Sequence, residues 1–243
     1  MREQVPEIRV FDGAEEIGRE AAERIAGVLR RRGPRVLVLA SGKTMVPVYR
    51  ELVRRHRDGR APFPRVMTFN LDELAVPAAD PRSFRTFMDR HLFSRVDLDP
   101  RRVGFLRGNA RDAIAECARY EEELARAGGA DLALVGIGSN GHVAYLEPGE
   151  SLAPVTSPVR LSAETRRTLA ADGFVPPPRR ALTMGIETIL SARRMLLVAT
   201  GRSKAAAVAC ALRGPVTARC PASYLSLHPK LTVLLDRSAA RQL

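Results

Sequence analysis

The sequence predicts an α/β fold with a mostly parallel sheet and helices on both faces. Short apolar runs alternate along the chain with longer amphipathic stretches, which is typical of strands joined by helical crossovers. The length of 243 residues suits one large domain. Apolar residues make up 45% of the chain, enough for one sizeable core. We therefore expect residues 1–243 to form a single domain.

Each predicted element follows from its local pattern. The first helix has Ile17, Ala21, Ile25 and Val28 on one face, with Asp12 as a candidate cap. The predicted helices span residues 14–32, 47–56, 83–96, 110–127 and 203–212. The predicted strands span residues 36–39, 65–69, 103–106, 132–135, 195–199 and 231–235. In such a fold, ligands bind in the loops that follow the strands.

Composition and charge exclude several function classes. The formal net charge is +12, but the arginines occur as scattered pairs without interleaved aromatic residues, so we expect no nucleic-acid partner. No run of about 18 apolar residues predicts a membrane span. The first residues lack a secretory signal, and the three cysteines match no metal or redox spacing. We expect a cytoplasmic protein without a metal or other cofactor.

The loop Ala40–Thr44 follows the predicted strand 36–39 and precedes a helix. Small residues, hydroxyl groups and free backbone N–H groups at a helix start suit a phosphate. A nucleotide P-loop is excluded, because that motif needs a glycine where Leu37 stands. A plain strand-to-helix turn is the alternative interpretation. The phosphate-binding candidates are Ser41, Gly42, Lys43 and Thr44.

Two further loops offer groups for proton transfer. Asn70-Leu71-Asp72-Glu73 places two carboxylates at a strand end, where they suit a general base; a helix cap is the alternative. Gly136–His142 satisfies the dinucleotide spacing G-x-G-x-x-G, but its late position and the following Pro148 argue against that site. Its glycines, Gly138 among them, would let a sugar lie against the backbone. Glu147, five residues beyond His142, would orient the imidazole and raise its pKa.

A fourth loop, Thr200–Lys204, follows the predicted strand 195–199. A cation at a helix start suits a second phosphate contact, since the helix dipole already favours anions there. Only two other lysines, Lys43 and Lys230, occur in the chain, which weakens the alternative of an ordinary surface lysine. The four loops together indicate a small phosphorylated sugar as the partner.

Several long segments in one order carry a resemblance that spans residues 35–236. The chain resembles the glucosamine-6-phosphate deaminase family and, more distantly, 6-phosphogluconolactonase. The segments are VMTFNLDE (66–73), SFRTFMDRHLFSRVD (83–97), CARYEEEL (117–124), GIGSNGHVAYLEPGESLA (136–153), ALTMGIETIL (181–190) and LHPKLTVLLD (227–236). The resemblance implies a modified Rossmann-like fold and conversion of glucosamine 6-phosphate to fructose 6-phosphate and ammonia.

The resemblance also implies residue roles. Asp72 would move a proton from C2 to C1 of the sugar, His142 would open the ring, and Glu147 would orient and charge-tune His142. The phosphate would be held by Ser41, Gly42, Thr44 and Lys204. A 6-phosphogluconolactonase-like hydrolase is the alternative, as is an isomerase of another amino-sugar phosphate. The oligomeric state stays open, and a homo-oligomer is compatible with the sequence.

The departures from the family pattern fall on the site. Asn140 stands where the family has an aspartate that helps orient the histidine, and Leu146 stands where the deaminases have asparagine. The segment at residues 160–180 corresponds to a shortened lid, and Ala171 or Asp172 falls where the lid usually supplies an arginine to the phosphate. We hypothesise that Lys43 replaces that arginine, because one positive charge is lost and one is gained around the same group.

Overall fold

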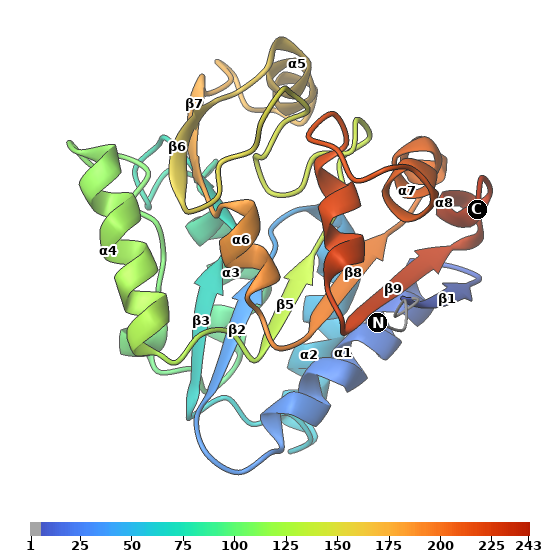
Figure 1. The fold of residues 1–243 in the computed structure, drawn as a ribbon. Helices are drawn as coiled ribbons and strands as arrows, with labels where there is room; N and C mark the ends of the chain where they lie inside the picture. The colour runs from blue at the N-terminus through green and yellow to red at the C-terminus, as the bar shows by residue number, and fades with distance from the viewer. Residues whose placement is uncertain (1–5) are drawn as a thin grey trace.

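Apolar runs build a six-stranded parallel sheet in the computed structural model, which describes residues 6–243 (Figure 1). The strand order is β1-β9-β8-β5-β2-β3, and every neighbouring pair is parallel. The strands are β1 (Glu7–Phe11), β2 (Arg35–Leu39), β3 (Val66–Asn70), β5 (Leu132–Val135), β8 (Met195–Ala199) and β9 (Leu231–Asp236). At the sheet edge, Glu7 of β1 is paired with Thr232 of β9.

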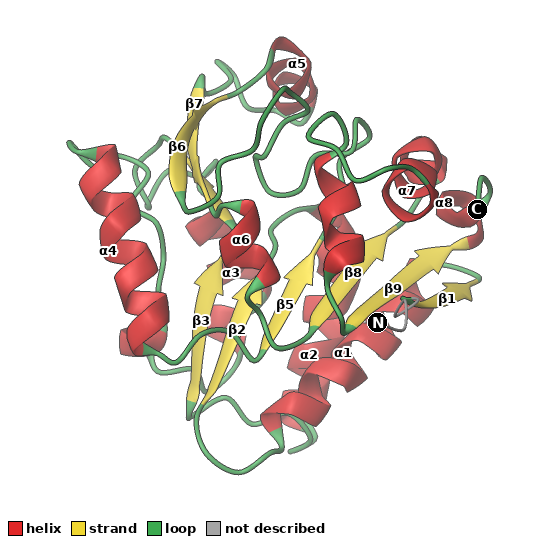
Figure 2. Cartoon of the chain, viewed as in Figure 1, coloured by secondary structure: helices red, strands yellow, loops and turns green. Residues whose placement is uncertain are grey.

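Helices cover both faces of this sheet, as the sequence predicts (Figure 2). Helices α1 and α2 pack against each other behind the strands, whereas α6 lies in front of them. The α-helices are α1 (Ala14–Leu29), α2 (Val46–Arg57), α3 (Phe84–His91), α4 (Ala113–Arg126), α5 (Ala163–Ala171), α6 (Ile186–Leu190), α7 (Ala205–Arg213) and α8 (Arg237–Ala240). The short 3-10 helices are η1 (Lys43–Met45), η2 (Phe93–Arg95), η3 (Pro100–Arg102), η4 (Arg202–Lys204) and η5 (Pro221–Leu227). No helix within residues 6–243 is both long enough and apolar enough to cross a membrane.

Three local predictions are wrong. Residues 103–106 form no strand, because Gly104 passes against the Phe69 ring and Val103 makes only one isolated bridge, to Thr68. The helix predicted over residues 83–96 ends at His91, and η2 follows it. Asp12 does not cap α1: the N-cap is Gly13, and the Asp12 carboxylate instead accepts a hydrogen bond from Arg237 at 2.6 Å.

A second, three-stranded sheet lies at one end of the molecule and is antiparallel. It contains β4 (Asp72–Leu74), β7 (Arg180–Thr183) and β6 (Ser157–Arg160), in that order. Helix α5 lies between β6 and β7 in the chain and covers a small hydrophobic cluster that includes Tyr145, Leu161 and Leu169. Helix α5 and the loops on either side of it occupy the segment predicted to be a lid, residues 160–180.

The topology places the candidate loops together. Strand β3 lies on one side of β2, whereas β5, β8 and β9 follow in order on the other side, so the direction of strand addition reverses between β2 and β5. Ligands of open parallel sheets bind at the carboxyl ends of the strands around such a reversal. The loops after β2, β5 and β8 meet at this edge.

Candidate functional site

The loop after β2 has the backbone expected of an anion-binding turn. Gly42 adopts a φ of 112°, which a residue with a Cβ rarely adopts, and η1 then leads directly into α2. The Ser41 hydroxyl accepts a hydrogen bond from the Asn70 amide at 3.3 Å. Asn70 itself is fully buried at the end of β3. No sequence motif connects Asn70 with Ser41, which lies 29 residues earlier, so this support for Ser41 could not be predicted.

The loop after β8 has the same construction. Gly201 adopts a φ of 90°, and η4 leads into α7. Lys204 ends η4 and is half-buried, and this burial lowers its pKa. Two similar turns, one with Ser41 and one with Lys204, therefore flank the loop that follows β5.

Lys43 does not point into a buried site. Its side chain is 83% exposed, and its ammonium forms an ion pair with Asp172 at 2.5 Å. Asp172 is the C-cap residue of α5, so the pair joins the loop after β2 to the segment predicted as a lid. An exposed pair of this kind contributes about 0–1 kcal/mol to stability.

The two neighbouring carboxyl groups after β3 have different surroundings. Asp72 and Glu73 are consecutive residues of β4, and consecutive side chains of a strand point to opposite faces. Glu73 accepts hydrogen bonds from the Ser83 hydroxyl at 2.6 Å and from the backbone N–H groups of Phe84 and Arg85 at 2.9 and 3.0 Å. Glu73 is therefore a structural cap for the start of α3, and the cap interpretation holds for this residue.

Asp72 has no such partners among the described residues. It is 8% exposed, and burial, with a smaller contribution from the negative charge of Glu73, raises its pKa to about 8. A carboxyl group with a pKa near neutrality in a buried position is suited to accept and return protons. Of the two carboxyl groups, Asp72 is the candidate for chemistry.

His142 is packed directly against Gly138. A Cβ at Gly138 would lie 2.4 Å from Nδ1 and from Cε1 of His142, so only glycine fits beneath the ring. The backbone supports this packing, because Gly138 N–H donates to the His142 carbonyl at 2.8 Å. Nδ1 of His142 is buried and has no hydrogen-bond partner among the described residues.

Asn140 and Glu147 lie beside His142 but do not bond to its ring. The Asn140 side chain accepts a hydrogen bond from the His142 backbone N–H at 3.2 Å and donates to Oε2 of Glu147 at 3.3 Å. Oε1 of Glu147 accepts a hydrogen bond from the hydroxyl of Thr165 on α5. The carboxylate is thereby fixed from two sides.

The pKa of His142 is lower than the sequence predicts. Burial lowers it, and this effect outweighs the negative charge of Glu147, which favours the protonated ring. Lys204 also lowers the pKa, whereas Glu164 of α5 raises it. Glu147 does raise the pKa of His142, as expected. Burial lowers this pKa by more, so the expectation of a net increase is wrong. Leu146, a departure from the deaminase pattern, is buried in the main hydrophobic core.

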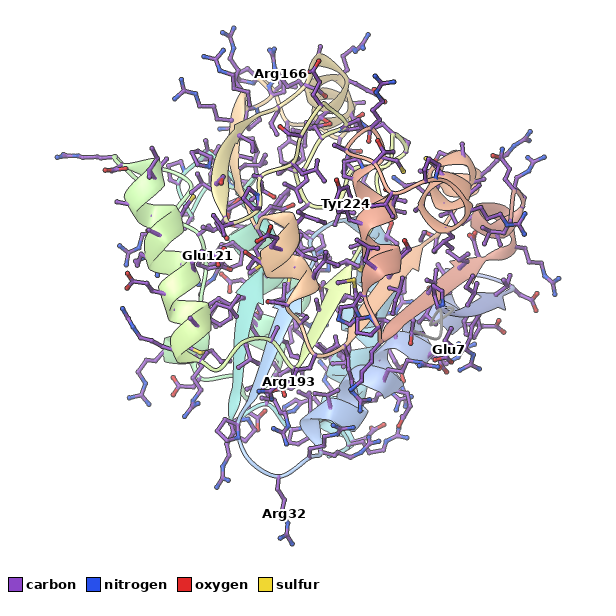
Figure 3. All side chains as sticks on the ribbon, viewed as in Figure 1. Glu7, Arg32, Glu121, Arg166, Arg193 and Tyr224 are labelled. Carbon is purple, nitrogen blue, oxygen red and sulfur yellow. The ribbon has the colours of Figure 1, made fainter. Side chains whose placement is uncertain are left out.

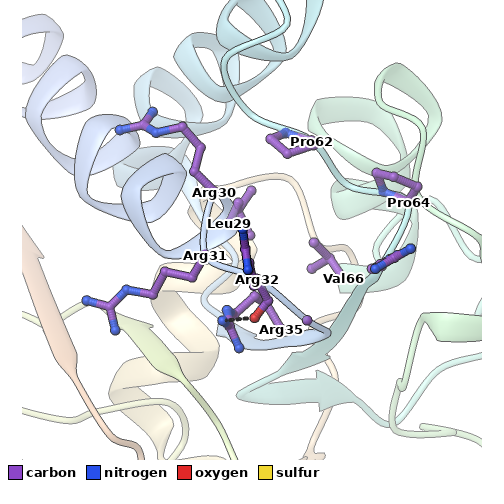
Figure 4. Close-up of a pocket in the computed structure, with 10 residues that line it drawn as sticks. Leu29, Arg30, Arg31, Arg32, Arg35, Pro62, Pro64 and Val66 are labelled. Carbon is purple, nitrogen blue, oxygen red and sulfur yellow. Dashed lines mark hydrogen bonds between the residues drawn. The ribbon is translucent and has the colours of Figure 1, made fainter.

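A cavity at the opposite end of the sheet contains none of these residues. Its volume is about 220 Å³, and it lies between the end of α1 and the Pro62–Val66 segment (Figure 4). Arg30, Arg31, Arg32, Arg35 and Arg65 line it. Figure 3 shows Arg32 at this end of the molecule and Arg166 of α5 at the other end.

Comparisons with known sequences identify the family of the chain. Residues 12–234 match the family of glucosamine-6-phosphate isomerases and 6-phosphogluconolactonases. The glucosamine-6-phosphate deaminase of Cellvibrio japonicus is 40% identical over 240 residues, which cover 96% of this chain and 90% of that protein. Glucosamine-6-phosphate deaminase 1 of Bacillus subtilis is 42% identical over 231 residues, which cover 93% and 95% respectively.

Comparisons with solved structures give the same fold. A monomeric glucosamine-6-phosphate deaminase superposes with a TM-score of 0.94 at 40% identity, and the alignment covers 98% of this chain and all of that one (100%). The 6-phosphogluconolactonase of Trypanosoma cruzi superposes with a TM-score of 0.80 at 22% identity, over 99% and 97% of the two chains. At that identity, the lactonase shares the fold, and the fold alone does not imply its activity.

Proposed function

The chain belongs to the family of glucosamine-6-phosphate isomerases and 6-phosphogluconolactonases, and we propose that it is an enzyme that converts glucosamine 6-phosphate into fructose 6-phosphate and ammonia. The observation that carries the proposal is the identity of 40% to a glucosamine-6-phosphate deaminase over 96% of the chain. The buried Asp72 of β4 and the imidazole of His142, in the loop after β5, would supply the proton-transfer groups that this reaction needs.

The first step of the proposed reaction opens the sugar ring. His142 transfers a proton between the anomeric hydroxyl and the ring oxygen, which gives the open-chain aldehyde. Its lowered pKa leaves the ring neutral at pH 7, with one nitrogen able to accept a proton. Gly138 packs against the imidazole, and Asn140 donates a hydrogen bond to Glu147, the charged neighbour of the ring.

The second step moves a proton between two carbons. Asp72 removes the proton from C2 and returns it to C1, while one proton of the substrate's ammonium group passes to the aldehyde oxygen. This leaves a hydroxyl at C1 and a protonated imine at C2. Water then hydrolyses the imine to the ketone and releases ammonia. In the free enzyme the raised pKa keeps much of Asp72 protonated at pH 7. The positive amino group of the substrate favours its ionised form, because opposite charges stabilise each other at short range.

The phosphate completes the recognition of the substrate. The loop Ser41–Thr44 offers backbone N–H groups and hydroxyls at the start of α2, and Lys204 supplies a positive charge from the loop after β8. Lys43 is the further cation that we propose for the phosphate, in place of the lid arginine. It would exchange its contact with Asp172 for the phosphate dianion. A cytoplasmic location and a homo-oligomer remain predictions.

The test is an assay of ammonia and fructose 6-phosphate with purified protein and glucosamine 6-phosphate. We expect both products in equal amounts, and neither from Asp72→Asn. A 6-phosphogluconolactone substrate is assayed in parallel. The native enzyme could instead release no ammonia and hydrolyse the lactone, with hydrolysis retained in Asp72→Asn. That outcome would contradict the proposed deaminase and favour the hydrolase.

A further inference from the structure

Helix α5 contacts the site loops at both of its ends. Thr165, in its first turn, donates a hydrogen bond to Glu147 of the loop that carries His142. Asp172, its C-cap residue, forms the ion pair with Lys43 of the loop after β2. Between these contacts, Leu169 anchors the helix in the small hydrophobic cluster that also contains Tyr145. The helix thus spans from the proton-transfer group to the proposed phosphate loop.

Thr165 is placed to control the Glu147 carboxylate. The residue is 7% exposed, so its hydroxyl competes with little water for this contact. Of the two Glu147 oxygens, Oε2 is held at 3.3 Å by Asn140 of the same loop, and Oε1 is held by Thr165 of α5. A hydrogen bond to a carboxylate stabilises its ionised form. Loss of the Thr165 hydroxyl would free one oxygen and weaken the hold on the other.

The same helix contributes charge to the imidazole. The charged groups that act on His142 are Glu147 of its own loop, Glu164 of α5 and Lys204 of η4. The two glutamates favour the protonated ring, whereas Lys204 opposes it. One glutamate lies on α5 and the other is bonded to α5 through Thr165. The balance of charge around His142 therefore depends on where α5 lies.

We propose that Thr165 is a positioning residue for the ring-opening step. Its hydroxyl holds Glu147 beside His142, so proton transfer depends on the position of α5. The inference rests on the proposed function for the identity of that step. The contact with Glu147 and its effect on His142 do not depend on the identity of the substrate. Binding of a phosphate by Lys43 would alter the contact at the other end of the same helix, so the two halves of the site are linked through α5.

The test compares three substitutions on α5. Thr165→Val keeps the shape of the side chain and removes the hydroxyl, whereas Thr165→Ser keeps the hydroxyl. Thr168→Val is the matched control, because the Thr168 hydroxyl bonds only to the Glu164 carbonyl one turn back and the residue is exposed. The His142 ring is titrated by NMR without substrate, with its signals assigned by their loss in His142→Asn. The pH dependence of kcat/KM is measured in parallel.

We expect Thr165→Val to lower the pKa of His142, because the negative charge of Glu147 is then less well fixed beside the ring. The limb of the pH profile that His142 controls should move to lower pH, and kcat should fall about tenfold while KM changes little. Thr165→Ser should restore both values, and Thr168→Val should match the native enzyme. If Thr165→Val does not fold, Thr165→Ala is titrated instead.

An unchanged His142 titration in a folded Thr165→Val or Thr165→Ala variant would overturn the inference. Equal losses in Thr165→Ser and Thr168→Val would do the same, because they would indicate general damage to α5. A native enzyme that releases no ammonia would contradict the proposed function alone. The NMR titration would still decide whether Thr165 sets the ionisation of His142.

Discussion

The imidazole of His142 rests on the bare Cα of Gly138, where an added Cβ would lie 2.4 Å from Nδ1. Real Cβ atoms do not approach another heavy atom so closely, so Gly138→Ala must displace the ring or the loop. We expect kcat/KM for glucosamine 6-phosphate to fall about a hundredfold, because misplacement of a reacting group by about 1 Å costs that much. Circular dichroism and urea unfolding should show a folded protein.

Gly136→Ala is the matched control for that substitution. A Cβ there would lie 3.2 Å from Cε of Met45, the end of a flexible side chain that can move aside. We expect activity within about threefold of the native value, since the variant leaves His142 in place. Equal losses of activity in the two alanine variants would show that the loop tolerates no added Cβ at either position. That result would contradict a specific role for Gly138.

The activity of the free enzyme should rise with pH toward the pKa of Asp72. Burial raises this pKa to about 8, and a base works only when it is ionised. We expect kcat/KM to increase up to about pH 8, and to fall by at least about a thousandfold in Asp72→Asn. The measurement is a pH profile of ammonia release at low substrate concentration. A profile already flat between pH 5 and pH 8 would remove Asp72 as the base with a raised pKa.

Asp72 should also make folding stability depend on pH. In the unfolded chain, its carboxyl group has the ordinary pKa of 3.8, whereas the folded value is about 8. Between these values the unfolded state loses the proton first, so the free energy of unfolding should decrease as the pH rises. Asp72→Asn should remove this decrease. At pH 8 it should stabilise the protein by a few kcal/mol, on the order of the free energy that corresponds to the difference between the folded and unfolded pKa of Asp72. Urea unfolding of both proteins at pH 5 and pH 8 tests this.

Glu73 should matter for stability instead. Its carboxylate accepts hydrogen bonds from Ser83, Phe84 and Arg85, and its removal would leave buried donors at the start of α3 without partners. We expect Glu73→Ala to lower the free energy of unfolding by about 2–4 kcal/mol. Where the variant is folded, KM should stay near the native value. A large rise in KM at full stability would instead give Glu73 a place in substrate binding.

Lys43 and Asp172 should have opposite effects on affinity. If Lys43 binds the phosphate, Lys43→Ala should raise KM about tenfold, whereas Asp172→Asn frees the lysine and should leave KM equal or lower. Folding stability should change by less than about 1 kcal/mol in both variants, because the pair is exposed. An unchanged KM in Lys43→Ala would remove the lysine from the phosphate site.

The sequence predicts strands that are uninterrupted apolar runs well, and short strands of mixed composition poorly. Strands 132–135 and 195–199 match β5 and β8 residue for residue, because every side chain in them is buried and apolar. Strands β4, β6 and β7 combine polar and apolar residues over three or four positions, which are too few for a periodicity to emerge. Their pairing is decided by tertiary contacts, as between Asp72 and Thr183.

The candidate site, like the fold, could be predicted only in part from the sequence. The glycine and hydroxyl residues that follow β2, β5 and β8 mark the loops, because turns of this kind need them. Sequence position could not separate Asp72 from Glu73, since the difference lies in which face of β4 each side chain occupies. Thr165 was missed because its partner, Glu147, is 18 residues away and no motif connects them.

The pairing of β1 with β9 has a consequence for how the molecule folds. Glu7 of β1 is paired in register with Thr232 of β9, which follows it 225 residues later, and β9 is the one strand that pairs with β1 within residues 6–243. On the ribosome, β1 must wait until β9 has emerged, and its apolar residues Ile8 and Val10 remain without that strand partner until then. Contacts so distant in sequence slow the search for the native pairing. The edge of the sheet therefore completes only once β9 has emerged, and until then the growing chain exposes the unpaired edge of β8 to its surroundings.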